Sequence, residues 1–106
     1  MRVVHSADTS EIAGWVSSPA LLSFNTADFA AHHADMHVCA LSEEGVVRAR
    51  CSMWWADVSP YRQHRVGVIG HYAATDDEAA GAVLTAALEQ LRQAGCTIAI
   101  GPMNGT

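Results

Sequence analysis

The sequence predicts an α/β domain in which a mixed sheet of about five strands is covered by two or three helices. Residues 36–55 alternate in polarity around a polar turn, which is typical of a β-hairpin. Residues 65–100 read as strand, helix and strand with short connections, which favours parallel strands and a right-handed crossover. At 106 residues we expect a single domain over 1–106.

The first third of the chain predicts one strand and two short helices. Residues 2–5 are β-prone, residues 11–16 suit a short helix, and residues 26–33 suit a second one. Short polar side chains that favour helix N-caps precede both helices. The candidate caps are Asp8, Thr9 and Ser10 for the first helix and Asn25 and Thr26 for the second.

Three strands are expected in the middle of the chain. Residues 36–41 and 46–55 form the hairpin, and regular alternation would place Trp54 and Trp55 on opposite faces of its second strand. The mostly apolar residues 65–74 suit a strand that is buried on both faces.

The clearest element is the helix that follows. Thr75 and Glu78 have the spacing of a capping box, and apolar residues then recur at helical spacing. These are Ala80, Val83, Leu84, Ala87, Leu88 and Leu91. Gly95 suits a left-handed helix stop, and residues 96–100 read as a last strand that Gly101 and Pro102 close.

Composition excludes several classes of function. Half of the residues are apolar, and eleven acidic residues against six arginines give a net charge of −5, so a nucleic-acid role is not expected. We expect no signal peptide or membrane span. Three cysteines without C-x-x-C spacing indicate reduced thiols and a soluble, cytoplasmic protein.

The order of these elements resembles the first two thirds of the GCN5-related N-acetyltransferase (GNAT) fold. The similarity is strongest over residues 46–106, where the ending Gly101-Pro102-Met103-Asn104 resembles an atypical bacterial branch of acetyltransferase-like proteins. The resemblance implies a truncated GNAT-like domain that lacks the family's C-terminal helix and β-hairpin. The fifth strand would then have an open edge, which favours a homodimer.

The resemblance also implies a site for acetyl-CoA and a small-molecule amine acceptor. Pantetheine would pair with the backbone of the fourth strand, at Tyr72, Ala73 and Ala74, and the pyrophosphate would rest on the start of the following helix. The helix-start positions implied are Thr75, Ala79, Ala80, Gly81 and Ala82. The backbone amide of Ala73 or Ala74 would polarise the acetyl carbonyl.

The same resemblance places His71 and Tyr72 near the acceptor amine, where either could serve as a general acid or base. The alternative is structural, because strand alternation would put one side chain into the core and the other on the opposite face. Both interpretations stay open at this stage.

The expected pyrophosphate loop departs from the family pattern of Arg or Gln, two residues, Gly, one residue, and Gly or Ala. Its places hold Asp76, Ala79 and Gly81, and Asp76, Asp77 and Glu78 bring negative charge where a phosphate would bind. Two functions remain: an acyl-CoA-dependent N-acyltransferase with a degenerate loop, or a non-catalytic remnant that acts as a dimerisation or partner-binding module.

His32, His33 and His37 form the densest group of candidate metal ligands. On one continuous helix, His33 and His37 would share a face and could bind zinc. The other interpretation is a helix end followed by a strand start. Because the sequence shows no third ligand, we expect no metal site and assign the cluster no function.

Overall fold

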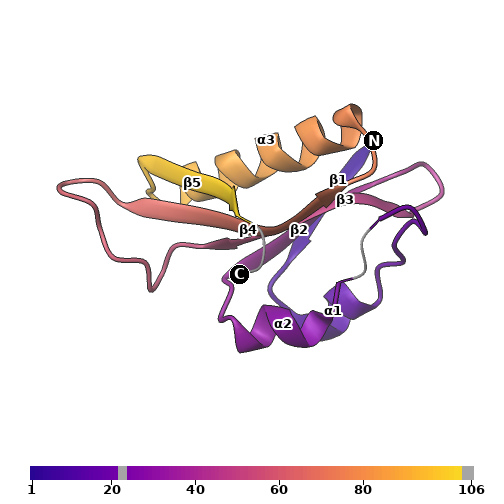
Figure 1. Ribbon diagram of the computed structural model, residues 1–106, viewed down its shortest axis with the longest axis horizontal. Coiled ribbons are helices and arrows are strands. Elements are labelled where there is room, and N and C mark those ends of the chain that lie inside the picture. Colours follow the sequence, from indigo (N-terminus) through magenta and orange to yellow (C-terminus); the bar gives the residue numbers. More distant parts are fainter. Residues whose placement is uncertain (22–23, 104–106) are drawn as a thin grey trace.

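A computed structural model describes residues 1–21 and 24–103; Asn104, part of the sequence resemblance, lies outside them. The described chain forms a five-stranded sheet in the order β1-β2-β3-β4-β5. Neighbouring strands are antiparallel except for β4 and β5, which are parallel. Helix α3 covers one face of the sheet, and α1 and α2 lie on the other (Figure 1). The predicted mixed α/β sheet with a parallel β4-β5 pair is therefore confirmed.

The strands are β1 Arg2–Ser6, β2 Met36–Leu41, β3 Val47–Trp54, β4 Val66–Ala74 and β5 Ile98–Met103. The helices are α1 Thr9–Ala13, α2 Thr26–Ala31 and α3 Asp77–Gln93.

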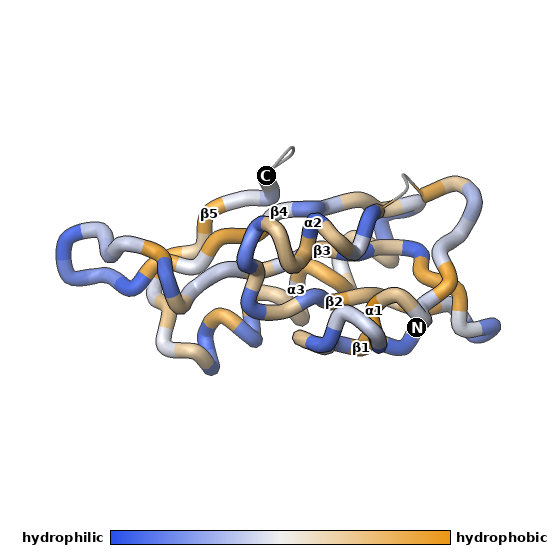
Figure 2. The backbone as a smooth tube through the Cα atoms, turned by 90° about the horizontal axis from the view of Figure 1, so that it is seen from below, coloured by the Kyte–Doolittle hydropathy of each residue, from blue (hydrophilic) through white to orange (hydrophobic). Residues whose placement is uncertain are grey.

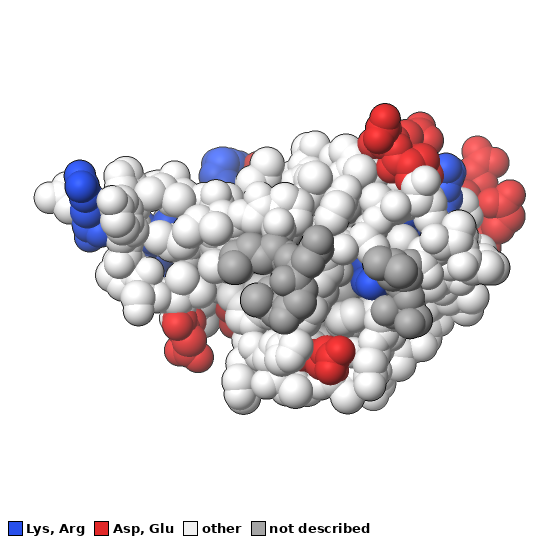
Figure 3. Space-filling model, viewed as in Figure 1, with Lys and Arg blue, Asp and Glu red and all other residues white. Residues whose placement is uncertain are grey.

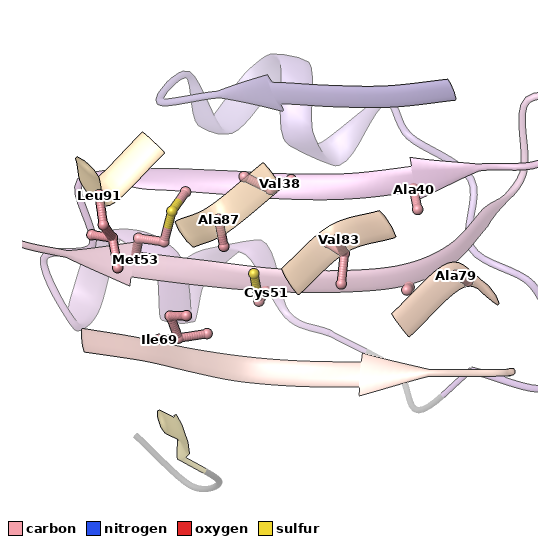
Figure 4. Close-up of a cluster of buried hydrophobic side chains, with 10 residues drawn as sticks. Val38, Ala40, Cys51, Met53, Ile69, Ala79, Val83, Ala87 and Leu91 are labelled. Carbon is pink, nitrogen blue, oxygen red and sulfur yellow. The ribbon is translucent and has the colours of Figure 1, made fainter. Parts of the chain in front are cut away.

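The main core lies between the sheet and α3. Four residues of α3, spaced at four-residue steps, turn toward buried side chains of β2, β3 and β4 (Figure 4). The helix residues are Ala79, Val83, Ala87 and Leu91. Leu88, expected on this face, is 50% exposed, and Ala79 is buried in place of Ala80. The centre of the buried face is therefore the row with Ala79, Val83 and Ala87, and not the adjacent row with Ala80, Leu84 and Leu88.

The two short helices differ from their predicted bounds. Asp8 and Asn25 are the N-caps, each accepting a hydrogen bond from the amide two residues on. Helix α1 ends at Ala13 because the next residues bond to β3: the Val47 amide donates to the Val16 carbonyl over 2.7 Å. Helix α2 ends at Ala31, since His33 has a left-handed φ of 58°.

The last strand continues past Gly101 and Pro102, which were expected to close it. Opposite Ile69 of β4, β5 carries Gly101 and Pro102, so the register shifts between the pairs Val68–Ile100 and Gly70–Met103. Gly101 has a φ of 133°, and a Cβ there would lie 2.4 Å from the Ile69 carbonyl oxygen. Proline is tolerated because β5 lies at the edge of the described sheet.

Across the described residues, no helix is long and apolar enough to cross a membrane. The tube in Figure 2 places hydrophilic residues at the tip of the long loop between β3 and β4, which extends from one end of the molecule.

The tight approach of β5 to β4 predicts that Gly101→Ala is destabilising. The added methyl group meets backbone, so the free energy of unfolding should fall by about 1–3 kcal/mol in urea titrations. Gly81→Ala is the control, because a Cβ at this exposed position of α3 meets nothing within 4 Å. It should raise stability by about 0.5–1 kcal/mol through helix propensity. Equal effects would show that the backbone approach does not constrain residue 101.

Candidate functional site

Three polar side chains meet on the sheet face opposite α3. His37 of β2 and Ser52 of β3 are register partners, and His71 of β4 follows Gly70, the other partner of Ser52. The Ser52 hydroxyl lies 2.7 Å from His37 Nδ1 and 2.9 Å from His71 Nδ1. Ser52 is fully buried and His37 is 1% exposed. A buried serine therefore joins two imidazoles that are 34 residues apart.

A β-bulge places His71 on this face. Between the pairs Ser52–Gly70 and Arg50–Ala73, β4 has two residues, His71 and Tyr72, where β3 has one. His71 has a φ of 52°, the left-handed region that costs a residue with a side chain about 1–3 kcal/mol. Regular alternation from Gly70 would have turned His71 toward α3, so the bulge is what brings it to Ser52.

A fourth side chain extends the hydrogen bonds to the surface. His32, at the C-cap of α2, is exposed, and its Nδ1 lies 2.8 Å from His71 Nε2. Its carbonyl accepts a 2.7 Å hydrogen bond from Trp54 Nε1, which fixes the end of α2 against β3. We call His32, His71, Ser52 and His37 the histidine chain.

The histidine chain has two possible directions of hydrogen bonding. The Ser52 hydroxyl carries one proton, so it donates to one imidazole and accepts from the other. When His32 Nδ1 donates to His71 Nε2, the neutral His32 ring presents an unprotonated Nε2. In the opposite direction His71 donates and His32 Nδ1 accepts. Each direction leaves every imidazole neutral, and the first one leaves His32 Nε2 able to accept a proton.

Burial and nearby charge keep the two inner histidines neutral. Burial, the Arg50 cation and His71 lower the pKa of His37 from 6.5 to about 3. Burial is also the largest cause that lowers the pKa of His71, with His32 and Arg50 adding to it and Asp28 opposing it. At neutral pH both rings are therefore uncharged.

Aromatic rings surround the histidine chain. Phe24 stacks on His37 with centroids 4.8 Å apart and lies 5.1 Å from His71. Trp54 contacts His71 edge-on at 5.1 Å, and the Arg50 guanidinium lies 5.2 Å from the Phe24 centroid. A cavity of about 80 Å³ lies beside His37. The rings hold the imidazoles in place and limit their contact with water.

Tyr72, the other predicted catalytic residue, lies apart from His71. It packs against the core cluster beneath α3, while His71 faces Ser52 on the opposite side of the sheet. The structure thus has the alternation foreseen in the structural interpretation of this pair.

The last residues of β4 pair with β3, where Ala73 and Ala74 lie opposite Arg50 and Ala49. On the other side, the described pairs between β4 and β5 run from Val66–Ile98 to Gly70–Met103. The contact of pantetheine with Tyr72, Ala73 and Ala74 stays a prediction from the family resemblance.

The start of α3 is less suited to a pyrophosphate. Asp76 is the N-cap, not Thr75: its Oδ1 accepts from the Ala79 amide over 2.8 Å, and its carbonyl accepts from the Ala80 amide over 3.0 Å. Thr75 instead donates to Asp76 Oδ2, which also pairs with Arg48. A carboxylate is the stronger acceptor, and these bonds lower the pKa of Asp76. The Asp76 carboxylate thereby occupies one of the free amides at the helix start, that of Ala79.

The other predicted positions near this turn differ in accessibility. Gly81 is exposed, Ala80 and Ala82 are half-buried, and Ala79 is fully buried. Glu43, Glu44 and Glu78 line a surface hollow with Arg48, and Figure 3 shows acidic side chains gathered at this end of the molecule. The local field opposes a phosphate.

Residues 1–21 and 24–103 contain no group of three or more His, Cys, Asp or Glu side chains placed to hold a metal ion. His33 and His37 do not share a helix, because α2 ends before His33 and His37 belongs to β2. The zinc geometry that their spacing would allow on one helix is therefore not formed.

Compared with family models and with curated proteins, the sequence shows no match. The fold is similar to that of a solved protein described as "Crystal structure of a probable acetyltransferase", with a TM-score of 0.58. The two chains are 16% identical, and the alignment covers 100% of this chain and 79% of that one. At this identity the similarity shows an acetyltransferase-like fold and nothing finer.

Sequence reasoning missed Ser52 and the pairing of His32 with His71. Ser52 sits in the hairpin strand between Cys51 and Met53, where a small polar residue gives no functional signal. The one indication in the sequence is the two-residue alternation of side chains in a strand. This alternation puts His37 and Ser52 on the face of the hairpin that points away from α3. His32 was noted only as a candidate metal ligand.

The low pKa of His37 predicts acid-dependent stability. The unfolded imidazole binds a proton below about pH 6.5 and the folded one only near pH 3, so the free energy of unfolding should fall as pH drops through this range. The contribution is at most about 1.4 kcal/mol per pH unit. His37→Gln should flatten the slope in urea titrations between pH 6.5 and 4, whereas His5→Gln, on exposed β1, should not. A slope unchanged by His37→Gln would mean that His37 is not held neutral.

Proposed function

We propose that this protein is an N-acyltransferase that moves an acyl group from acyl-CoA to an amine, with the histidine chain as the proton acceptor. The observation that carries the proposal is the bulge at His71. It places the His71 imidazole, bonded to His32 at the surface, beside residues 72–74 of β4, the segment expected to pair with an extended thioester ligand. The acetyltransferase-like fold supports the same reaction class.

The proposed reaction is direct transfer. The acceptor nitrogen attacks the thioester carbonyl carbon, the new C–N bond forms, and the C–S bond breaks. The proton lost by the amine passes to the His32–His71 pair, and the departing thiolate takes a proton from solvent. A backbone amide at Ala73 or Ala74 would stabilise the negative charge on the carbonyl oxygen. A role for Tyr72 as an acid stays a prediction.

The pantetheine end of acyl-CoA fits the site better than the nucleotide end with its pyrophosphate. The pantetheine end is expected along residues 72–74 of β4, whereas the Ala79 amide is engaged by the Asp76 carboxylate and the nearby hollow is acidic. We therefore expect weak binding of the nucleotide end, with affinity coming mainly from the thioester end.

Acetyl-CoA should bind, and His71 should be needed for transfer. At 100 times its dissociation constant, acetyl-CoA should add about 2.7 kcal/mol of stability, measured as a rise in melting temperature. His71→Asn keeps a residue that tolerates left-handed φ and should retain this rise, while kcat for amine acetylation falls by about 10²–10⁴-fold. His33→Asn is the matched control, because His33 has a similar φ of 58° and is exposed. No rise at millimolar acetyl-CoA would sink the proposal.

Removing acidic charge beside α3 should strengthen binding of acetyl-CoA. Glu43→Gln and Glu78→Gln each remove a like charge from the hollow near the helix start, so the dissociation constant should fall by about threefold at low salt. S-Acetyl-pantetheine, which lacks the pyrophosphate, should show no change. Glu89→Gln, in the last turns of the same helix, should leave both constants as in the wild type. An equal gain for both donors would contradict this placement of the pyrophosphate.

The Asp76 cap and the acidic hollow also favour a second candidate, a non-catalytic module that keeps the sheet and pairs with a second copy. β5 lies at the edge of the described sheet, and Ile100 on it is 47% exposed. Light scattering at micromolar concentration separates the candidates: a dimer with no response to acetyl-CoA supports the module, and a monomer rules it out.

A further inference from the structure

A continuous apolar hollow begins at the surface end of the histidine chain. Its first part, about 380 Å³, is lined by His32, Trp54, Val58 and Val68. Its second part, about 540 Å³, shares Val58 and Val68, continues along β4 and β5 past Val66, Ile98 and Ile100, and is closed on the loop side by residues 59–61 (Ser-Pro-Tyr). We call the two parts the apolar trough. Neither α1 nor α2 extends beneath the first half of β4, so no helix of the described chain covers this side (Figure 1).

The chemistry of the lining is specific. Among the described residues that line the trough, the polar side chains are His32, Trp54, Ser59 and Tyr61, and none is a carboxylate, a lysine or an arginine. The Trp54 N–H is already bonded to the His32 carbonyl, so the indole presents an apolar surface. A ligand with several charges would lose hydration here without gaining partners.

The reactive end of the trough is different in character. His32 lines the trough and bonds to His71, and Asp28 of α2 is close enough to act electrostatically on His71. An amine nitrogen would thus find an imidazole pair at this end, and largely apolar walls beyond it. The arrangement suits a molecule with one amine head and an apolar body.

We infer that the apolar trough binds the acyl acceptor, and that this acceptor is a primary amine with a single aromatic or branched aliphatic body. The inference rests on the proposed acyltransferase function for the identity of the site. It adds the substrate class: monoamines of this kind are favoured over polyamines, amino sugars and small hydrophilic amines.

Binding of the amine alone, followed by isothermal titration calorimetry without any acyl donor, tests the inference. 2-Phenylethylamine should bind the full chain at least about tenfold more tightly than ethanolamine or spermidine. Val68→Thr and Ile100→Thr, which replace a trough methyl group by a hydroxyl or shorten the side chain, should each weaken 2-phenylethylamine several-fold and leave ethanolamine unchanged. Val16→Thr, at an exposed valine outside the trough, is the matched control. Circular dichroism melts confirm that each variant is folded.

The outcomes separate the two proposals. If 2-phenylethylamine binds as expected but acetyl-CoA yields no acetylated product, the trough stands and the acyltransferase function fails. If spermidine or ethanolamine is bound or acetylated as well as 2-phenylethylamine, the substrate class is wrong while the function stands. If 2-phenylethylamine does not bind at millimolar concentration, or if the trough variants instead dissociate a dimer seen by light scattering, the trough is not an acceptor site.

Discussion

The arrangement of the site depends on one local departure from β geometry, the bulge at His71. A regular strand would alternate Gly70, His71 and Tyr72 across the sheet and would send the imidazole into the apolar layer under α3. Because of the left-handed φ at His71, Gly70 and His71 both face away from α3, so that the His71 ring reaches Ser52 and His32. The bulge also lies directly before Ala73 and Ala74, so it sets where the imidazole lies relative to the strand segment that we propose for the thioester.

Strain of this kind persists only where the surroundings determine the conformation. Here two hydrogen bonds hold the His71 ring, and Phe24 and Trp54 pack against it. On the other face, Tyr72 and Ala74 anchor the same strand in the core under α3. The conformation is therefore fixed from both sides of the sheet, and the imidazole is oriented before any ligand arrives. Such preorganisation lowers the cost of reaching a reactive geometry.

Much of the fold could be predicted from the sequence because local patterns agreed with the global arrangement. Polarity alternation gave the hairpin, and the strand-helix-strand pattern gave the parallel pair. The errors lie where tertiary contacts decide: α1 ends early because residues after it bond to β3, and Arg48 and Thr75 select Asp76 as the cap of α3. The bulge could not be predicted, since no glycine marks it and a residue with a side chain seldom takes a left-handed φ.

The site was harder to predict because its members come from four separate elements. His71 was identified by resemblance. Ser52 and His37 come into contact with it only because β2, β3 and β4 are neighbours in the sheet. His37 contributes a second hydrogen-bonding partner for Ser52. It cannot store a proton, since its pKa is about 3. Ser52 can thus either donate to or accept from His71 without being left unsatisfied, which allows His71 to present either tautomer to His32. A buried, permanently neutral histidine thus lets the direction of the hydrogen bonds in the outer pair reverse.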